Sequence, residues 1–411
     1  MKILHILNST NGGGVGGTLE FINHSIKKND DIVHIIVVPN QINIEDLNER
    51  YSIGLKDVKI IYVPMHWWNK KSSHSTFGTI AVELFGLFKT WFHFLSIFKI
   101  YKIIKKFDID FVYTTTACIK CGSIASSWAN VPHIWHIKER IGENGFMNFR
   151  LNDKELIQYI NDKSDLIITM SEYIAQIFYD NMDRKLLNLH VVADGFDLKK
   201  MNNDNKHNYN NIENTSINDQ LNIGLISSLG STIKRHDIFI NAAIDILNSN
   251  KNVKFIIFGD IPKKSRFFQK ESYSKYLSYL SLIKELNLEE KIVFAGHINN
   301  IENIMDEIDI LTHCCDKEGF GRVIIEGMAF SKPIIVPDEG GASEIVINDY
   351  NGLHFKSGDY LSLSKKINNL ISDNDIRLKF GKNGYKRFLE SYNMNSHYLK
   401  ITNLIKNLPK A

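Results

Sequence analysis

Short apolar runs alternate with helical patterns along the first half of the chain. Strands are predicted in the runs KILHIL, IVHIIVVP, VKIIYVP, FVYTTT, PHIWHI, LIITMS and LHVVAD. Continuous apolar runs of this length, bounded by polar or turn residues, are typical of parallel strands that helices cover on both faces. Amphipathic helices are predicted between them at 17–28, 79–106, 153–162 and 172–185. The pattern therefore predicts a doubly wound α/β domain.

The alternation stops at residues 201–220, where asparagine is the commonest residue, and then resumes. This segment has too few apolar side chains to order itself by burial, so we predict a linker or insertion. Beyond it, strands are expected in LNIGLIS, VKFIIFGD, KIVFAGHI, IDILTHCC, KPIIVPD and GLHF. Helices are expected at 236–248, 268–287, 322–330, 341–347 and 360–392. In such α/β domains, ligands bind at the carboxyl ends of the strands.

The length of the chain agrees with two domains, because 411 residues exceed what one hydrophobic core usually serves. We expect an N-terminal domain at 1–197, the Asn-rich linker at 198–220, a C-terminal domain at 221–385 and a helical segment at 386–411 that can return to the N-terminal domain. The 49 basic and 46 acidic residues nearly cancel, to a net charge of +3. Such a balance gives no indication of nucleic-acid binding.

The cysteines do not form a pattern typical of zinc sites. They occur as Cys118-x-x-Cys121 and as the neighbours Cys314 and Cys315, which favours buried thiols over a metal or redox site. A metal site from His133, His136 and Glu139 is also disfavoured, because strand residues three apart face opposite ways. No Asp-x-Asp pair lies where it could hold a metal against phosphates. We therefore expect no metal.

Residues 79–104 form a long apolar stretch that Glu83, Lys89 and Lys99 interrupt, so a membrane-spanning helix is not expected. Its aromatic residues recur near helical spacing, and three lysines, Lys102, Lys105 and Lys106, lie at its end or directly after it. The favoured interpretation is an amphipathic core helix, and the alternative is a helix on an anionic membrane surface. The short apolar start does not resemble a signal peptide, so we expect a cytoplasmic protein, peripheral at the inner membrane face if this helix binds lipid.

The glycine loop NGGGVGG at 11–17 raises the possibility of a dinucleotide-dependent enzyme. Gly12, Gly14 and Gly17 have the spacing of a dinucleotide fingerprint, which would make the protein an NAD(P)-dependent oxidoreductase. That fingerprint needs an acidic residue near the end of the second strand, but this strand ends in Val37-Val38-Pro39-Asn40. The loop is therefore interpreted as a surface where small residues let a ligand approach the backbone closely.

The most informative stretch is EGFGRVIIEGMAFSKPIIVPDEGGASEIV at 318–346. Glu318 closes the loop after the strand IDILTHCC, and Glu326 lies in the next helix. Gly319 and Gly321 allow the backbone to approach a ligand, and the helix beginning near Arg322 directs free N–H groups toward it. A carboxylate at Glu326 can accept both hydroxyls of a ribose.

This stretch resembles the E-x7-E signature of glycosyltransferase family 4, the retaining GT-B enzymes that use nucleotide sugars. The likeness also covers the glycine loop, Lys234 and the runs IWHIKE (134–139), SDLIITMSEYIAQIF (164–178), VVADGFD (191–197), FAGHI (294–298) and GGASEIV (340–346). The resemblance implies a GT-B fold, with two Rossmann-like domains facing a central cleft. The N-terminal domain would bind the acceptor and the C-terminal domain the nucleotide sugar.

The same resemblance implies roles for individual residues. Glu318 would contact the donor sugar, Glu326 the ribose and Lys234 the diphosphate. His136 would reach the donor sugar, and Gly16 and Gly17 would lie beside the diphosphate where the acceptor enters. The remaining donor-binding residues would be Gly319, Phe320, Gly321, Arg322, Val323, Arg235, Gly296 and His297.

Each of these residues also has a purely structural interpretation. Glu318 could cap the following helix, Glu326 could pair with Arg322 at i, i+4, and Lys234 could be a surface lysine. His136 could be a core histidine bonded to the backbone, and His297 could act as a cap.

The chain also departs from the family pattern. Where relatives carry Gly-Arg shortly before the lysine, this chain has Ser228-Leu229, so Arg235 or Arg322 would have to replace the missing arginine.

Taken together, the resemblance implies a retaining, metal-independent glycosyltransferase without a cofactor. It would move a sugar from a UDP- or GDP-linked donor to a hydroxyl of a glycan or lipid-linked acceptor, in the synthesis of cell-surface polysaccharide or lipopolysaccharide. Two alternatives stay open at this point. One is the NAD(P)-dependent oxidoreductase, and the other is a catalytically inactive adaptor at a membrane surface.

Overall fold

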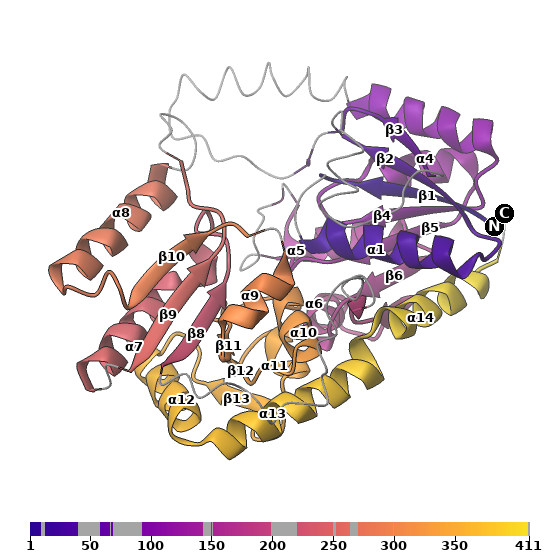
Figure 1. The fold of residues 1–411 in the computed structure, drawn as a ribbon. Coiled ribbons are helices and arrows are strands. Elements are labelled where there is room, and N and C mark those ends of the chain that lie inside the picture. The colour runs from indigo at the N-terminus through magenta and orange to yellow at the C-terminus, as the bar shows by residue number, and fades with distance from the viewer. Residues whose placement is uncertain are drawn as a thin grey trace, which may run out of the picture. The chain divides into compact units, whose positions relative to one another are not determined.

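The structure is a computed structural model that divides the chain into two compact units (Figure 1). Unit 1 comprises Met1–Asp197 and Asn393–Ala411, and unit 2 comprises Leu198–Tyr392. The described residues are 1–9, 13–39, 58–65, 67–68, 93–142, 149, 151–198, 220–249, 252–263, 270–298 and 300–409. The predicted Asn-rich linker at 201–220, except its last residue, and residues 79–92 of the aromatic stretch lie outside them.

Unit 1 is built on a parallel sheet of seven strands in the order β3-β2-β1-β4-β5-β6-β7. The strands are β1 (Lys2–Leu7), β2 (Val33–Val38), β3 (Lys59–Tyr62), β4 (Phe111–Thr115), β5 (His133–Ile137), β6 (Leu166–Thr169) and β7 (Leu189–Val191). In register, Leu4 of β1 pairs with Ile35 of β2 on one side and with Val112 of β4 on the other. The strand order therefore reverses direction between β1 and β4.

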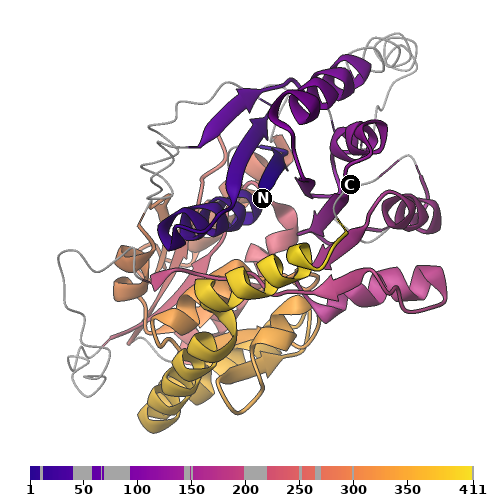
Figure 2. The same ribbon diagram turned by 90° about the vertical axis from the view of Figure 1, so that its right-hand side faces the viewer.

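Helices cover both faces of this sheet. They are α1 (Gly13–Lys28), a helix at 93–107, α4 (Cys121–Ala129), α5 (Asp153–Asp162), α6 (Glu172–Met182) and α14 (Met394–Lys406). Ile3 and Leu7 of β1 pack with α1 and α14, whereas Leu4 and Ile6 pack with the 93–107 helix and α4. This alternation follows from the period of two along a strand. Helix α14, from the end of the chain, lies beside α1 from its beginning (Figure 2).

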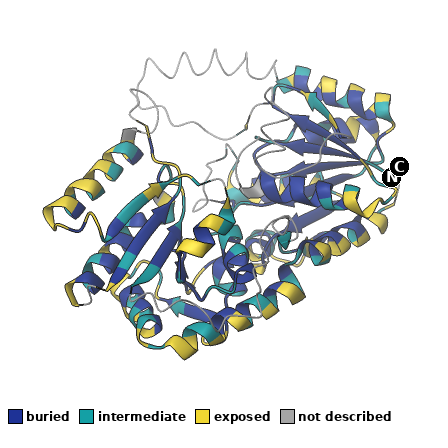
Figure 3. Ribbon diagram, viewed as in Figure 1, coloured by how far each residue is buried: buried dark blue, intermediate teal, exposed yellow. Residues whose placement is uncertain are grey.

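Unit 2 repeats the architecture with six parallel strands in the order β10-β9-β8-β11-β12-β13. The strands are β8 (Leu221–Ile226), β9 (Val253–Phe258), β10 (Ile292–Gly296), β11 (Ile310–Thr312), β12 (Ile334–Pro337) and β13 (Gly352–Phe355). Here the order reverses between β8 and β11. Most strand residues in both sheets are buried, as their apolar sequences predict (Figure 3).

The helical elements of unit 2 are η4 (Thr232–Lys234), α7 (His236–Ser249), α8 (Lys270–Glu285), α9 (Ile301–Glu307), α10 (Arg322–Ala329), α11 (Gly341–Ile345), α12 (Tyr360–Ser372), α13 (Asn374–Arg387) and the π-helical turn η5 (Phe388–Tyr392). Buried residues of α7 and α12 pack together with β8 and β9 in one core cluster. Helices α13 and η5 pack against α10, so unit 2 extends to Tyr392 rather than ending at 385.

Two predicted helices differ from the structure. Helix α1 begins at Gly13 rather than at 17, so Gly16 and Gly17 are helical residues and not part of a loop. The single helix expected at 360–392 is broken at Asp373, whose side chain accepts a hydrogen bond from the Ile376 amide and starts α13. The short helices α4 and α9 had not been predicted. The sequence of α4, CGSIASSWA, has small polar residues where an apolar helical stripe would give a signal.

Among the described helices, none combines the length and the apolar character needed to cross a bilayer.

The core of unit 2 gives a test of the fold. Phe239 of α7 is fully buried, and its ring meets that of Phe255 in β9 at 5.6 Å. Phe239→Ala should lower the free energy of unfolding of unit 2 by about 3–5 kcal/mol, because it removes buried apolar area and leaves a cavity. Urea denaturation followed by circular dichroism measures this change. Leu277→Ala, on the exposed side of α8, is the control and should cost less than about 0.5 kcal/mol. Equal effects of the two substitutions would contradict the packing.

Candidate active site

The point where strand order reverses is the usual ligand-binding edge of a doubly wound sheet, because the helices on its two sides diverge there. In unit 2 this point lies between β8 and β11. The segment after β8 leads to Lys234, and the segment after β11 leads to Glu318. Two of the predicted site residues, 84 positions apart in the sequence, thus lie at one edge of one sheet.

Lys234 and Glu318 form an ion pair at this edge. The Lys234 ammonium donates a hydrogen bond to Oε2 of Glu318, and the two side chains are 28% and 14% exposed. Burial by itself would raise the pKa of Glu318 and lower the pKa of Lys234. The opposite charge outweighs burial in both cases, so the pKa of Glu318 is lowered and that of Lys234 is raised. Both groups are therefore charged at neutral pH, and Lys234 is not a free surface lysine.

Arg235 is held by two acidic side chains. Its Nη2 lies 3.0 Å from Oδ2 of Asp237, and its Nη1 donates to Oδ2 of Asp316. These contacts, with Asp237 making the largest contribution, raise the pKa of Arg235. The positive charge of Arg235 is thus balanced within unit 2, which weakens the expectation that it replaces the missing arginine at the diphosphate.

Helix α10 starts at a glycine that fits the predicted close-approach loop. Gly321 is the N-cap residue, with φ of 94°, and no side chain caps the helix, so Glu318 does not have the capping role considered above. Phe320 beside it is buried near the ring of Tyr392, and Val323 in the first turn is half-buried. Helix α10 therefore begins directly after the Glu318 segment, at an N-cap residue that has no side chain.

The glycine pair at 340–341 packs against the backbone of the Glu318 segment. The Gly341 amide donates to the Glu318 carbonyl at 2.8 Å, and a Cβ added at Gly341 would lie 2.1 Å from the carbonyl oxygen of Gly319. No other residue type fits there unless the backbone moves. This close approach is the physical reason for the GGASEIV pattern, which the sequence alone had related only to a family.

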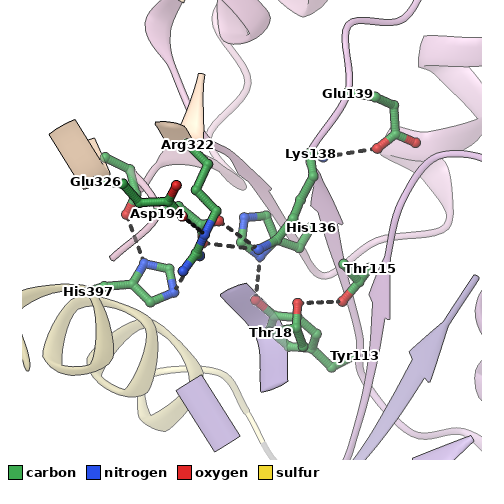
Figure 4. Close-up of polar contacts among 11 residues, drawn as sticks. Thr18, Tyr113, Thr115, His136, Lys138, Glu139, Asp194, Arg322, Glu326 and His397 are labelled. Atoms are coloured by element: carbon green, nitrogen blue, oxygen red, sulfur yellow. Dashed lines mark hydrogen bonds and ion pairs between the residues drawn. The ribbon is translucent and has the colours of Figure 1, made fainter. Parts of the chain in front are cut away.

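Arg322 and Glu326 lie one turn apart on α10. Arg322 Nε lies 3.0 Å from Glu326 Oε1 (Figure 4). The two side chains are largely buried, with exposed fractions of 14% and 17%. The i, i+4 pair considered as an alternative is present. Glu326 nevertheless does not point into bulk solvent, because its side chain is only 17% exposed.

Gly296 and His297 lie at the end of the edge strand β10. Gly296 has φ of 76°, and His297 is exposed, with Nδ1 3.3 Å from Oδ1 of Asp260 at the end of β9. They share the carboxyl edge of the sheet with Lys234 and Glu318 but stand two strands away from β8. A contact with the nucleobase is therefore geometrically separate from the Lys234–Glu318 pair.

In unit 1, His136 lies near the carboxyl end of β5. Its Nδ1 is 2.6 Å from the hydroxyl oxygen of Tyr113, while its Nε2 is buried and has no hydrogen-bond partner among the described residues (Figure 4). Burial, with a smaller contribution from Lys138, lowers the pKa of His136 well below its ordinary value. His136 is therefore neutral at neutral pH and is bonded to a side chain, not to the backbone.

Lys138 and Asp194 form a second, more deeply buried ion pair, which the sequence analysis missed. Lys138 Nζ lies 3.0 and 3.2 Å from the two Asp194 oxygens, and the side chains are 4% and 2% exposed. His397 of α14 completes the cluster, with Nε2 3.8 Å from Oδ1 of Asp194 and Nδ1 2.8 Å from the carbonyl of Ala193. A lysine directly after a buried strand is the only local signal, and it does not reveal a partner 56 residues away.

The other predicted residues of unit 1 have separate structural partners. His133 bonds Thr114 through Nε2 at 2.8 Å, and Glu139 accepts hydrogen bonds from Thr116 and from the Ala117 amide, so these residues do not converge with His136 on a metal. Gly16 and Gly17 are buried in α1, whose next residue, Thr18, has its hydroxyl oxygen 3.4 Å from that of Thr115 in β4. They thus lie near the β1/β4 reversal point, on a helix rather than a loop.

Comparisons with known proteins agree with this architecture. Residues 209–387 match the family model described as glycosyl transferases group 1. The chain is 27% identical over 306 residues to the uncharacterized glycosyltransferase MJ1178 of Methanocaldococcus jannaschii, covering 73% of this chain and 76% of that protein. It is 26% identical to the capsular polysaccharide biosynthesis glycosyltransferase CapM of Staphylococcus aureus, over 42% of each chain.

Two further matches concern a named enzyme and a solved structure. The chain is 25% identical to the N-acetylgalactosamine-N,N'-diacetylbacillosaminyl-diphospho-undecaprenol 4-alpha-N-acetylgalactosaminyltransferase of Campylobacter jejuni, over 55% of this chain and 56% of that enzyme. The crystal structure of HepE from Anabaena with UDP and glucose superimposes with a TM-score of 0.73 at 20% identity, covering 99% of this chain and 100% of that one.

The two parallel-sheet α/β units have the GT-B fold, as the sequence had indicated. Residues 209–387, less than half of the chain, are similar to the glycosyl transferases of group 1.

The Lys138–Asp194 pair makes a testable contribution to stability. Lys138→Met should lower the free energy of unfolding by about 3–5 kcal/mol, because it leaves Asp194 charged and buried without its main counter-ion. The double variant Lys138→Met/Asp194→Leu should recover most of that loss in urea denaturation. Lys154→Met, which removes an exposed pair with Asp183 at 3.7 Å, is the control and should cost less than about 1 kcal/mol. A double variant as unstable as the single one would show that the charge pair is not the cause.

Proposed function

We propose that the protein is a retaining, metal-independent glycosyltransferase that moves a sugar from a nucleoside-diphosphate sugar to an acceptor hydroxyl. The observation that carries this proposal is the Lys234–Glu318 ion pair at the strand-order reversal of unit 2. A cation for a diphosphate and a carboxylate for sugar hydroxyls stand together there, next to the uncapped start of α10.

On binding of the donor, Lys234 exchanges one anion for another. The ammonium leaves the Glu318 carboxylate and meets the diphosphate, where it stabilises the charge that develops as the glycosidic bond breaks. The amides at the start of α10 face the same anion, and the partial positive charge of the helix end adds to their effect. Glu318, released from Lys234, accepts hydrogen bonds from hydroxyls of the sugar. Because Lys234 already balances the charge of Glu318, neither group has to change its protonation state.

Glu326, one turn further along α10, is proposed to bind the ribose hydroxyls. Arg322, which pairs with Glu326, is the proposed second cation for the diphosphate, because Arg235 is held by two carboxylates, Asp237 and Asp316. Gly319, Phe320, Gly321 and Val323 shape the backbone around the donor. Gly296 and His297 are proposed to lie toward the base. The donor is proposed to be a UDP or GDP sugar, and HepE, a protein of this fold whose structure with UDP-glucose is known, supports this choice.

His136 is proposed to hydrogen-bond the donor sugar through its free Nε2. A neutral imidazole with a very low pKa is a poor proton acceptor, so His136 does not serve as the general base. We propose instead that the acceptor hydroxyl attacks the face from which the diphosphate leaves, and that the leaving oxygen takes its proton. Gly16 and Gly17, in the first turns of α1, leave space for the acceptor.

Binding and turnover test this proposal together. The melting temperature of the wild type is measured with UDP, GDP, ADP and CMP sugars and with NAD. A UDP or GDP sugar should raise it, and NAD should not. Glu318→Gln and Lys234→Ala should each lower kcat by about 10²–10³, as does the loss of one preorganised contact to a transition state. Turnover should persist in EDTA, and NMR of the product should show the anomeric configuration of the donor.

The matched controls are Glu271→Gln and Lys275→Ala, which break an exposed ion pair on α8 and should leave kcat unchanged. Wild-type turnover in either site variant, or stabilisation by NAD alone, would overturn the proposal. Donor turnover by the wild type would also exclude an inactive adaptor.

The acceptor is proposed to be a glycan or lipid-linked intermediate of cell-surface polysaccharide or lipopolysaccharide synthesis. The printed names of the Staphylococcus and Campylobacter relatives, one a capsular polysaccharide enzyme and one acting on a diphospho-undecaprenol compound, support this proposal. A lipid-linked acceptor would require the protein to work at the inner face of the cytoplasmic membrane.

The aromatic patch of unit 1, defined here as Phe94, Phe98, Tyr101 and Trp128, supports contact with such a membrane. Phe94, Phe98 and Trp128 are 54%, 41% and 44% exposed, although Ile97, Ile100, Ile103 and Ile104 on the opposite side of the 93–107 helix are buried. The core-helix interpretation accounts for the isoleucines but not for the exposed rings. Lysines Lys99, Lys102, Lys105 and Lys106 are exposed along the same helix, so the patch combines aromatic and basic groups.

Vesicle sedimentation tests the membrane contact. Phe94→Ser/Phe98→Ser should lower binding to phosphatidylglycerol vesicles by about tenfold or more, because each exposed ring loses its burial in the interface. Binding of the wild type should also fall with salt and be weaker to phosphatidylcholine vesicles. Leu361→Ser/Leu389→Ser removes two equally exposed apolar side chains from unit 2 and serves as the control. Unchanged binding of the Phe94/Phe98 variant would rule out the patch.

A further inference from the structure

The segment after β11 brings together three side chains that suit a metal ion. His313, Cys315 and Glu318 each offer one ligand atom, and these atoms all lie within 4.8 Å of one another. His313 is 4% and Cys315 is 1% exposed. The side chain of Glu318, which pairs with Lys234, is 14% exposed. The three residues are spaced i, i+2 and i+5 along one short stretch, so a single segment supplies all of them.

The contact between His313 and Glu318 brings two of these ligand atoms together. Nε2 of His313 is buried and lies 3.5 Å from Oε2 of Glu318. A cation between them would be contacted by both an imidazole nitrogen and a carboxylate oxygen, the kinds of ligand atom that zinc accepts. The nitrogen lies next to the same carboxylate that would complete the site.

The neighbouring cysteines differ in what they contact. Residues 313–315 lie outside regular secondary structure, directly after β11. Cys314 belongs to the core cluster of unit 2 with Ile223, Leu225 and Ile310. Cys315 instead lies with His313 and Glu318, and its Sγ is within 4.8 Å of their ligand atoms. The two adjacent thiols are thus distinguished by their surroundings, and only one of them can join His313 and Glu318.

We propose that His313, Cys315 and Glu318 bind a thiophilic divalent cation such as Zn²⁺, and that the bound ion inhibits the enzyme. Imidazole nitrogen, thiolate sulfur and carboxylate oxygen are all zinc ligands, whereas Mg²⁺ and Ca²⁺ prefer oxygen. Binding converts the Cys315 thiol to thiolate and releases its proton to solvent, so it strengthens as pH rises. The ion also takes Glu318 Oε2 from Lys234, whose ammonium moves away.

Inhibition follows because the ion and the donor need the same carboxylate. An ion on Glu318 blocks the hydrogen bonds to the donor sugar and displaces Lys234 from its place near the diphosphate. This second part rests on the proposed function, since it assumes that Glu318 and Lys234 bind the donor. The ion would therefore act as a competitive inhibitor and not as a catalytic metal.

Cobalt titration of the full, metal-stripped chain tests the site without any activity measurement. The wild type should bind one Co²⁺ with a thiolate-to-cobalt absorption band, and Zn²⁺ should remove that band. Cys315→Ser should abolish the band, and His313→Gln should weaken binding at least tenfold. Cys314→Ala is the matched control and should keep the band. Lys234→Ala should bind Co²⁺ more tightly than the wild type, because the competing ammonium is gone.

The outcomes separate the site from its consequence. No band in the wild type, or a band that survives Cys315→Ser, overturns the metal site. If Co²⁺ binds but Zn²⁺ leaves stabilisation by the nucleotide sugar unchanged, the inhibition is overturned while the site stands. If no nucleotide sugar stabilises the metal-free protein, the proposed function fails, and the cobalt result still decides the site.

Discussion

The ion pair between Lys234 and Glu318 is the interaction on which the proposed function depends. Two charged groups are held at the carboxyl edge of a parallel sheet, in a place that is only partly open to solvent. Each group keeps the other ionised against the cost of burial. A site built in this way is ready for an anion and for hydroxyl groups without any proton transfer. It also needs a firm backbone, which the close contact between Gly341 and Gly319 supplies.

Each unit carries a lysine–carboxylate pair beyond the carboxyl ends of its strands, but the two pairs differ in exposure. Lys234 and Glu318 are partly accessible, whereas Lys138 and Asp194 are sealed in the core with His397. An accessible pair can exchange partners with a ligand at small cost, because water can solvate the displaced group. A sealed pair cannot, since separating it would leave a buried charge. We therefore interpret the Lys234–Glu318 pair as ligand-binding residues. The Lys138–Asp194 pair is interpreted as a structural contact that holds the segments around His136 and Asp194 in place.

The Glu318 segment shows how one stretch of chain can serve several purposes. Its Cys314 packs in the core of unit 2, its Glu318 carbonyl accepts a hydrogen bond from the Gly341 amide, and its Glu318 side chain pairs with Lys234. Burial of Cys314 fixes the position of its neighbours. The chemistry of His313 and Cys315 is then decided by geometry that the core imposes, and not by any spacing typical of a metal motif.

The sequence by itself predicted the strands of the described residues and the α/β alternation, because burial on both faces gives continuous apolar runs. It also named Glu318 and Glu326 as candidates, because the glycine-rich turn between them is a local signal. It did not determine α4, whose small residues lack a stripe, or the start of α1 at Gly13. Only the tertiary structure decided the partners Lys234–Glu318, Lys138–Asp194 and Arg235–Asp316, which are 84, 56 and 81 residues apart. The order of strands in a sheet sets such contacts, and that order is a property of the packed chain and not of any local pattern.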